Sequence, residues 1–516
     1  MTFYFPFTLI KPPVQKILIL LTFFLFITFF ARSQFVYDEN CRNAYKAILS
    51  MRFEDAKQYL ELEKKGNPSN RIPVYLDNYL DFLTLFIDEN PEQFKELNRK
   101  EYFRLKFLEQ ADNNSPYYRF CLAQVRLQWA FIRLKFGEYI TAVTDIKRAS
   151  NLLETNQAHY PGFLLNYSGL AIIHTISGLV PDQYKWLSNL LGFEGSIEQG
   201  TDELNVLASY TGNDEVIKMY QQEIIFYLAF IEVNLKKDKS EALQILKLYE
   251  QSTGMNEYMK NPLMVFSMAS ILMKNGFNDK AIGLLSTHPN TQDRFPIHYL
   301  DYMMGIAKLN RLDPDADTYF LSFLNSFHGL NYIKSAYQKL AWTYLMQGNY
   351  KKYNENINMI IDHGTAIVDE DRQALLEAHK KEVPNITLLK ARFLFDGGYY
   401  DRAIHELLDR SLKEILNTKK DLLEYTYRMG RIYQETANFP KAFQYYKQTL
   451  KLGSGQSYYF AANAALQMGI INENAGNNYE AEKYYQLCLS MHYEEYKNSL
   501  SQKAKAGLKR VQRNNP

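Results

Sequence analysis

The fold is decided by the segment Thr426-Tyr-Arg-Met-Gly-Arg-Ile-Tyr433 and by the Phe439-Pro-Lys-Ala442 that follows it. An aromatic residue three positions before a small residue, just after a turn, recurs at Phe53-Glu-Asp-Ala56, Tyr139-Ile-Thr-Ala142 and Tyr400-Asp-Arg-Ala403. Near variants are Ser240-Glu-Ala242, Phe277-Asn-Asp-Lys-Ala281 and Tyr479-Glu-Ala481. The alanines 403, 442 and 481 follow one another at intervals of 39 residues, as do 242 and 281. A period between about 20 and 50 residues is typical of solenoids and repeat arrays.

Helix packing explains this pattern. A small side chain early in the second helix of a hairpin lets the two backbones approach, and the preceding aromatic fills the groove between them. One hairpin cannot bury its apolar face alone, so hairpins stack. Strand-like alternation is rare in the chain, and Gly or Pro separates segments of helical length. We therefore expect an all-α protein in which helical hairpins form an α-solenoid.

These residues resemble a tetratricopeptide repeat. Met429-Gly430, Tyr433, Phe439, Ala442 and Tyr446 follow the family's order of small, aromatic and turn positions. The next unit matches at Met468-Gly469, Gly476, Ala481 and Tyr485 but has Asn472 where an aromatic is usual, and the unit before matches at Ala391, Gly398, Tyr400 and Ala403. The resemblance is strong over 388–489 and covers most of 41–500. It implies a bacterial cell-envelope protein that binds its partners in a concave groove.

The N-terminus has the layout of a signal peptide. Lys11 and Lys16 precede the apolar run Ile17–Phe30, and Ala31-Arg32-Ser33 has small residues at the two positions that a signal peptidase recognises. We expect residues 1–33 to be removed, with cleavage after Ser33. The alternative is a retained anchor, but the run is shorter than the roughly 20 residues that span a membrane as a helix.

Composition argues against a nucleic-acid partner. The 516 residues include 59 Lys and Arg against 57 Asp and Glu, and loss of the signal peptide would remove three of the basic residues and no acid. The mature chain would therefore lack the basic balance of a nucleic-acid binder. Three cysteines are too few for a disulfide framework, although a Cys41–Cys121 bridge is conceivable.

Three regions follow the signal peptide. Residues 34–210 are predicted to form a degenerate helical-repeat domain, 215–500 a more regular array, and 501–516 a basic C-terminal cap. Within the first region, 160–207 resembles a segment of a eukaryotic tetratricopeptide family linked to outer mitochondrial membranes and inclusion clearance. The shared features are a Gly-bounded apolar helix, Pro181 and Leu191-Gly-Phe-Glu-Gly195 followed by Gly200. The favoured interpretation is a buried helical hairpin, and the alternative is a docking or membrane-peripheral hairpin.

The sequence carries no catalytic motif, metal-ligand spacing or phosphate loop that withstands scrutiny. Asp313-Pro-Asp-Ala-Asp317 fails as a calcium loop, since Thr318 and Leu324 stand where Gly and Glu are needed. His174 is expected to be a hydrogen-bonded core residue. We predict a non-enzymatic scaffold without cofactor or metal.

Carrying over the family's register places the candidate groove on the first helix of each repeat. The candidate partner-binding residues are Asn385, Arg392, Tyr427, Arg431, Gln434, Asn463 and Glu473. The expected partner is a protein of the cell envelope, in the periplasm or at the outer membrane, and peripheral membrane association is possible. An outer-membrane-associated glycan-binding protein of helical-repeat type is the alternative, and an enzyme is the third choice.

Overall fold

The computed structural model describes residues 34–177, 195–236, 239–253, 261–287, 293–408, 418–493 and 495–513. These residues form 24 α-helices and a short π-helical turn, with no strand among them. The signal peptide proposed for 1–33 lies outside the described residues. The all-α prediction is confirmed, and the molecule is an α-solenoid of tetratricopeptide-like hairpins with a less regular N-terminal part.

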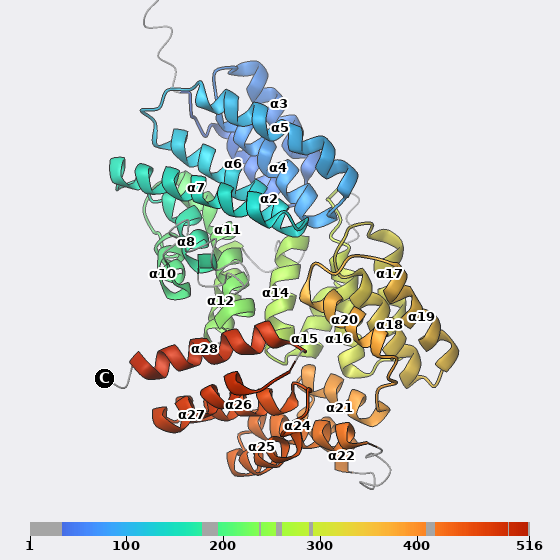
Figure 1. The fold of residues 1–516 in the computed structure, drawn as a ribbon. Coiled ribbons are helices and arrows are strands. Elements are labelled where there is room, and N and C mark those ends of the chain that lie inside the picture. Colours follow the sequence, from blue (N-terminus) through green and yellow to red (C-terminus); the bar gives the residue numbers. More distant parts are fainter. Residues whose placement is uncertain are drawn as a thin grey trace, which may run out of the picture.

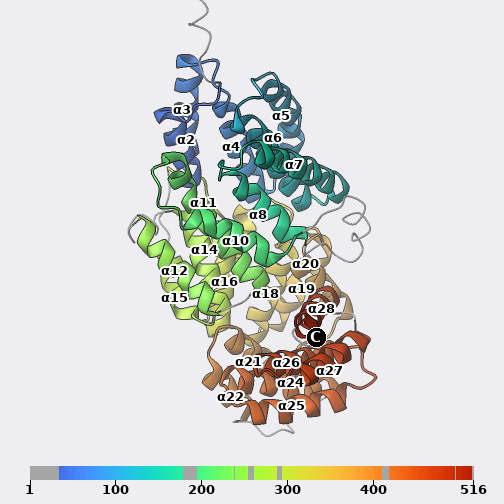
Figure 2. The same ribbon diagram turned by 90° about the vertical axis from the view of Figure 1, so that its left-hand side faces the viewer.

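The N-terminal helices lie at one end of the molecule and the C-terminal hairpins at the other (Figures 1 and 2). The first helices are α2 (Glu39–Leu49), α3 (Phe53–Gly66), α4 (Ile72–Asp88), α5 (Pro91–Glu109), α6 (Pro116–Lys135), α7 (Tyr139–His159), α8 (Asn166–Ser177) and α10 (Ile197–Ala208). The middle of the chain contains α11 (Glu215–Ile231), η2 (Glu232–Lys236), α12 (Lys239–Thr253), α14 (Pro262–Lys274), α15 (Asn278–Ser286), α16 (Tyr299–Arg311), α17 (Ala316–Ser326), α18 (Ile333–Met346), α19 (Tyr350–Asp362) and α20 (Asp369–Lys380). The last helices are α21 (Ile386–Asp396), α22 (Tyr400–Leu408), α24 (Lys419–Glu435), α25 (Phe439–Gly453), α26 (Phe460–Asn474), α27 (Asn478–Ser490) and α28 (Lys497–Arg513).

Small residues permit the close packing of each hairpin. Ala403, Ala442 and Ala481 are completely buried, as the repeat pattern predicts. A tyrosine of the second helix also lies flat against a glycine of the first. A Cβ added at Gly430 would lie 2.6 Å from ring carbons of Tyr446.

The same arrangement recurs 39 residues later, where a Cβ at Gly469 would lie 2.6 Å from Tyr485. The hydroxyl of Tyr446 donates to Gln434 of its own hairpin (2.5 Å), and that of Tyr485 donates to Glu473. The repeat therefore includes a glycine, a tyrosine and a polar residue that binds the tyrosine hydroxyl.

Two hairpin turns that are far apart in sequence meet in the middle of the solenoid. α21 packs against α16 as well as against α22, although α17 to α20 intervene in the sequence. The turn at Gly398 lies on the turn at Gly276, and both glycines have positive φ. A Cβ at Gly398 would lie 2.7 Å from the Cα of Gly276. This contact leaves no room for any larger residue at 398.

The N-terminal core does not stop at the join that we predicted between 210 and 215. One buried cluster extends from Phe35 to Ala307. Within it, the carboxylate of Glu223 accepts hydrogen bonds from the hydroxyls of Tyr45 (2.5 Å), Tyr79 (2.7 Å) and Tyr227. The apolar core and this polar network both cross residue 210. The division at 210 stays a prediction.

The 160–207 region contains two closely packed helices, α8 and α10. A Cβ at Gly200 would overlap the carbonyl oxygen of Ala171 and the hydroxyl of Thr175, which explains the glycine. His174 is hydrogen bonded to Glu203 at 2.8 Å, as expected for a core histidine. The Leu191–Glu194 part of the motif lies outside the described residues.

Cys41, Cys121 and Cys488 are all buried free thiols, so the conceivable Cys41–Cys121 bridge is not formed. Among the residues that the structure describes, no helix combines the length and apolar character needed to cross a membrane.

Candidate functional site

The inner face of the C-terminal hairpins encloses a pocket of about 210 Å³. Its walls come from α21, α24, α26 and α28, with Tyr459 and Tyr496 preceding the last two helices. The lining residues are Arg392, Phe395, Asp396, Tyr427, Arg428, Arg431, Tyr459, Asn463, Tyr496, Ser499, Leu500 and Lys503. The first helices of successive repeats thus form the pocket, as the carried-over register predicts.

Four of the seven candidate groove residues meet in this pocket. Arg392, Tyr427, Arg431 and Asn463 all line it. The Tyr427 hydroxyl accepts hydrogen bonds from Asn463 Nδ2 (2.6 Å) and from Arg431 (3.3 Å). α24 and α26 are therefore joined by a polar contact directly at the pocket wall.

The other three candidates have structural partners. Asn385 caps α21 by accepting from the backbone N–H groups of Thr387 and Leu388. Gln434 and Glu473 hold the tyrosine hydroxyls of their own hairpins. Glu473 also accepts two hydrogen bonds from Arg510 of α28. None of the three lines the pocket, because Asn385 is held by the first turn of α21 and the other two by tyrosine hydroxyls.

Positive charge dominates the pocket walls. The lining includes Arg392, Arg428, Arg431 and Lys503 but only one acid, Asp396. Each arginine has a carboxylate one helical turn away on its own helix. Arg428 is hydrogen bonded to Glu424, whereas Arg392 and Arg431 lie 3.8 Å and 3.7 Å from Asp396 and Glu435. The last two contacts are longer than hydrogen bonds, so donor capacity remains on both groups.

The unused donor capacity is clearest at Arg431. Its Nε is buried and has no hydrogen-bond acceptor among the described residues. The guanidinium lies over the ring of Phe395, 4.9 Å from the centroid. A buried N–H without an acceptor costs free energy, but Nε is closed to a ligand, so a carboxylate or phosphate oxygen would bind the terminal nitrogens of the guanidinium.

Lys339 and Trp342 of α18 extend the positive surface beyond the pocket. The Lys339 ammonium and the Arg392 guanidinium both lie against the Trp342 ring, 4.5 Å and 5.2 Å from its centroid. Burial, and then the positive charge of Arg392, lower the pKa of Lys339 to about 8. The neighbouring Glu377, Glu370 and Asp371 offset only part of this lowering.

Sequence reasoning did not place Arg428, Tyr496 and Lys503 in the groove, for identifiable reasons. Arg428 precedes Arg431 by three residues, so both lie on one face of α24, a spacing visible in the sequence. Lys503 was not predictable from the register, since 501–516 was interpreted as a cap, and Tyr496 lies in the turn before α28, outside the helix positions that the register describes. α28 instead packs along α26 and α27 and supplies one wall of the pocket.

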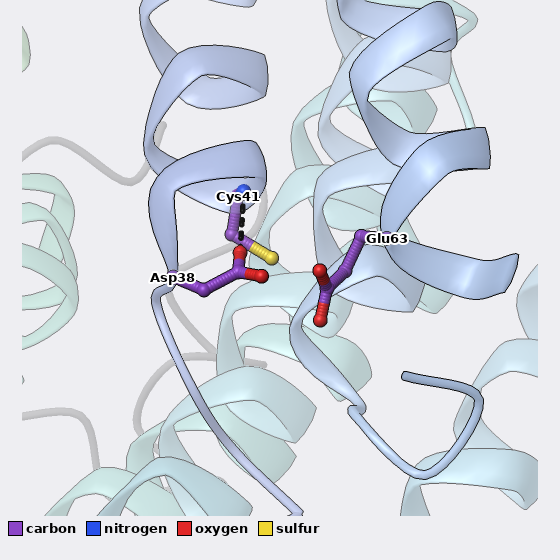
Figure 3. A group of neighbouring side chains, drawn as sticks. All are labelled: Asp38, Cys41 and Glu63. Atoms are coloured by element: carbon purple, nitrogen blue, oxygen red, sulfur yellow. Dashed lines mark hydrogen bonds between the residues drawn. The ribbon is translucent and has the colours of Figure 1, made fainter. Parts of the chain in front are cut away.

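A second group of side chains has the composition of a metal site. Asp38, Cys41 and Glu63 bring their ligand atoms within 4.8 Å of one another (Figure 3). However, the Asn70 amide donates to Glu63 (2.9 Å) and to the Cys41 sulfur (3.6 Å), and so occupies the lone pairs that a cation would need.

The proton balance of this group also opposes a metal ion. Burial, and then Asp38, raise the pKa of Cys41, which keeps the thiol protonated. Burial, and then the hydrogen bond with Asp38, raise the pKa of Glu63, whereas that of Asp38 is lowered despite its burial, by hydrogen bonds from Glu63 and Cys41. Asp38 serves as the N-cap of α2, so its carboxylate already accepts from the backbone N–H of Cys41. The residues do not fit a metal centre.

Comparison with known proteins identifies no family for this chain. No protein-family model matches it, and no curated protein does either. Among solved structures, the human IFIT1 dimer with PPP-AAAA aligns at 15% identity over 81% of this chain and 96% of that chain, with a TM-score of 0.34. The Cut9–Hcn1 hetero-tetramer of the APC/C aligns at 12% identity over 91% of this chain and 95% of that chain, with a TM-score of 0.24. Both scores are too low to support a functional argument, so the function must be argued from the pocket itself.

Proposed function

We propose that this protein is a non-enzymatic scaffold that holds an acidic segment of a protein partner in the groove lined by α21, α24, α26 and α28. One observation carries the proposal: four cationic side chains and one acid line the pocket, and the guanidinium groups of Arg392 and Arg431 lie 3.8 Å and 3.7 Å from Asp396 and Glu435, beyond hydrogen-bond distance. Arginine is suited to this task because its planar fork binds a carboxylate through two parallel hydrogen bonds.

The aromatic residues would supply the apolar part of the contact. Phe395, Tyr427, Tyr459 and Tyr496 surround the arginines. Tyrosine and arginine are the residues that most often dominate binding energy at protein interfaces. A peptide with an aspartate or glutamate beside an apolar side chain fits both the cationic and the aromatic residues of this lining.

The N-terminal sequence supports a place for the scaffold in the cell envelope. Residues 1–33 have the charge and apolar pattern of an export signal. N-terminal sequencing of the protein from its native cells tests this point, and a chain beginning at Gln34 is the expected result. A chain that retains Met1 and stays in the cytosol would contradict export.

The groove is tested with fluorescent peptides of defined charge. Anisotropy titrations of the full chain would use a hexaglutamate peptide carrying one phenylalanine, the matching hexalysine peptide and a single-stranded RNA hexamer. The glutamate peptide is expected to bind, and the binding should weaken as salt rises. Preferential binding of the RNA would contradict the proposal, as would equal binding of both peptides.

Matched variants place the binding in the pocket. Arg431→Ala should weaken binding of the glutamate peptide roughly thirtyfold, since loss of one partner of a desolvated charge pair costs about 2 kcal/mol or more. Arg431→Lys keeps the charge without the fork and should recover only part of the loss. Arg148→Ala, at an exposed arginine on α7 that lies 3.8 Å from the buried Asp145, is the control and should bind like the parent chain. A melting temperature for each variant separates lost binding from lost folding.

A further inference from the structure

An exposed aromatic and basic stripe runs along the C-terminal half of α5. Arg99, Tyr102, Phe103, Lys106 and Phe107 follow the three- and four-residue spacing of one helical face. Tyr102 is 61% exposed, Phe103 69% and Phe107 38%. Side chains of this size are normally buried, so three of them together on a solvated helix need an explanation.

The charge along this stripe is entirely positive. Glu101 is the only acid between Arg99 and Leu108, and it is buried and paired with Arg133 of α6. The Lys106 ammonium lies 5.6 Å from the centroid of the Tyr102 ring. The opposite face of α5 buries Phe94, Leu105 and Leu108 against the core, so the stripe is the face that the fold leaves uncovered.

The stripe lies where the N-terminal segment joins the folded part of the chain. The Gln34 side chain accepts a hydrogen bond from the backbone of Asp112, three residues beyond the end of α5 (2.6 Å). The Gln34 carbonyl accepts from the backbone of Arg71 (2.7 Å), whose guanidinium lies 3.8 Å from the centroid of the Phe107 ring. The sequence immediately before Gln34 contains the apolar run Ile17–Phe30.

We propose that the α5 stripe is a membrane-contact surface that rests at the headgroup level of an anionic bilayer. Aromatic side chains prefer the interface between water and hydrocarbon, and neighbouring lysines and arginines bind anionic headgroups. The apolar N-terminal run would bring a bilayer to the same edge of the molecule during export. The proposal is independent of the groove, because the helices that line it lie away from α5, toward the other end of the solenoid (Figure 1).

An environment-sensitive probe on the chain that begins at Gln34, the form expected after export, tests this inference. The three native cysteines are buried, so an NBD label can be directed to Phe103→Cys on the stripe and, in a second protein, to Tyr479→Cys on α27. The two positions are matched, since Phe103 is 69% exposed and Tyr479 66%, and Tyr479 also has a lysine over its ring. Each protein is mixed with vesicles of phosphatidylcholine, with and without phosphatidylglycerol.

The probe at 103 should shift to the blue on vesicles containing phosphatidylglycerol and be quenched by nitroxide-labelled lipid, whereas the probe at 479 should not change. Arg99→Gln together with Lys106→Gln should reduce the shift at 103. Three results would each overturn the inference. The chain fails to bind anionic vesicles, the probe at 103 does not change when the chain is bound, or the probes at 103 and 479 respond equally. Because both labelled proteins begin at Gln34, membrane attachment through residues 1–33 cannot produce the shift at 103.

Discussion

Replacing Gly398 by alanine tests the contact between the two hairpin turns in the middle of the solenoid. The backbone at Gly398 has a φ of +81°, where an alanine is strained by roughly 1 kcal/mol. The added Cβ would lie 2.7 Å from the Cα of Gly276 and closer still to its carbonyl oxygen, both of which are backbone atoms that cannot rotate away. Separating the turns adds an overpacking cost of about 1–3 kcal/mol, for a total of roughly 2–4 kcal/mol.

Gly476→Ala is the matched control. Gly476 ends a hairpin turn with a φ of +76°, but an added Cβ there would meet nothing within 4 Å. It should therefore cost only the backbone strain of roughly 1 kcal/mol.

Urea denaturation compares the two variants, and hydrogen exchange followed by mass spectrometry locates the damage. For Gly398→Ala we expect faster exchange at the turn around Gly276, more than a hundred residues away, as well as around 398. Equal destabilisation by the two variants would refute this reasoning, as would exchange changes confined to α21 and α22.

Three further outcomes are expected. Burial raises the pKa of Asp371 to about 6 from an ordinary value of 3.8, so between these pH values the folded carboxyl keeps a proton that the unfolded chain has released. The free energy of unfolding should therefore fall by up to roughly 3 kcal/mol between about pH 4 and pH 6. Denaturation of Asp371→Asn should lack this component. Tyr446→Phe removes the hydroxyl bound to Gln434 and should lower the free energy of unfolding by about 1 kcal/mol in urea denaturation. Tyr479→Phe, at an exposed tyrosine, should leave the free energy of unfolding unchanged. Equal losses would contradict the contribution of the Tyr446 hydrogen bond. Lys339→Met should raise stability at pH 7 by up to roughly 3 kcal/mol, because burial penalises the charged ammonium in the folded chain. The gain should shrink as the pH rises above about 8, and a gain independent of pH would contradict the lowered pKa of Lys339.

The fold was predictable because the repeat pattern records steric contacts. Ala403, Ala442 and Ala481 are each enclosed by their hairpins, and a close approach of backbones tolerates only small residues. The contact between Tyr446 and Gly430 could be predicted from the same segment, since both residues recur at the same interval.

The site was predictable only in part, because the register fixes which helix faces the groove but not what each side chain binds. Arg392, Arg431 and Asn463 reached the pocket, whereas Gln434 and Glu473, on the same helices, are held by tyrosine hydroxyls. The return of α21 to α16 and the position of α28 depend on contacts between distant segments, which a local pattern does not encode.

The central claim is that a partner protein lies in the groove beside α28, and photo-crosslinking in the native cells tests it most directly. A diazirine amino acid at Ser499, in the pocket lining, is compared with one at Lys447, exposed on α25. The account predicts a crosslinked polypeptide from position 499 alone, joined through a segment rich in aspartate or glutamate, and its loss in Arg431→Ala. A product that forms equally from position 447, or that persists in Arg431→Ala, would contradict the account.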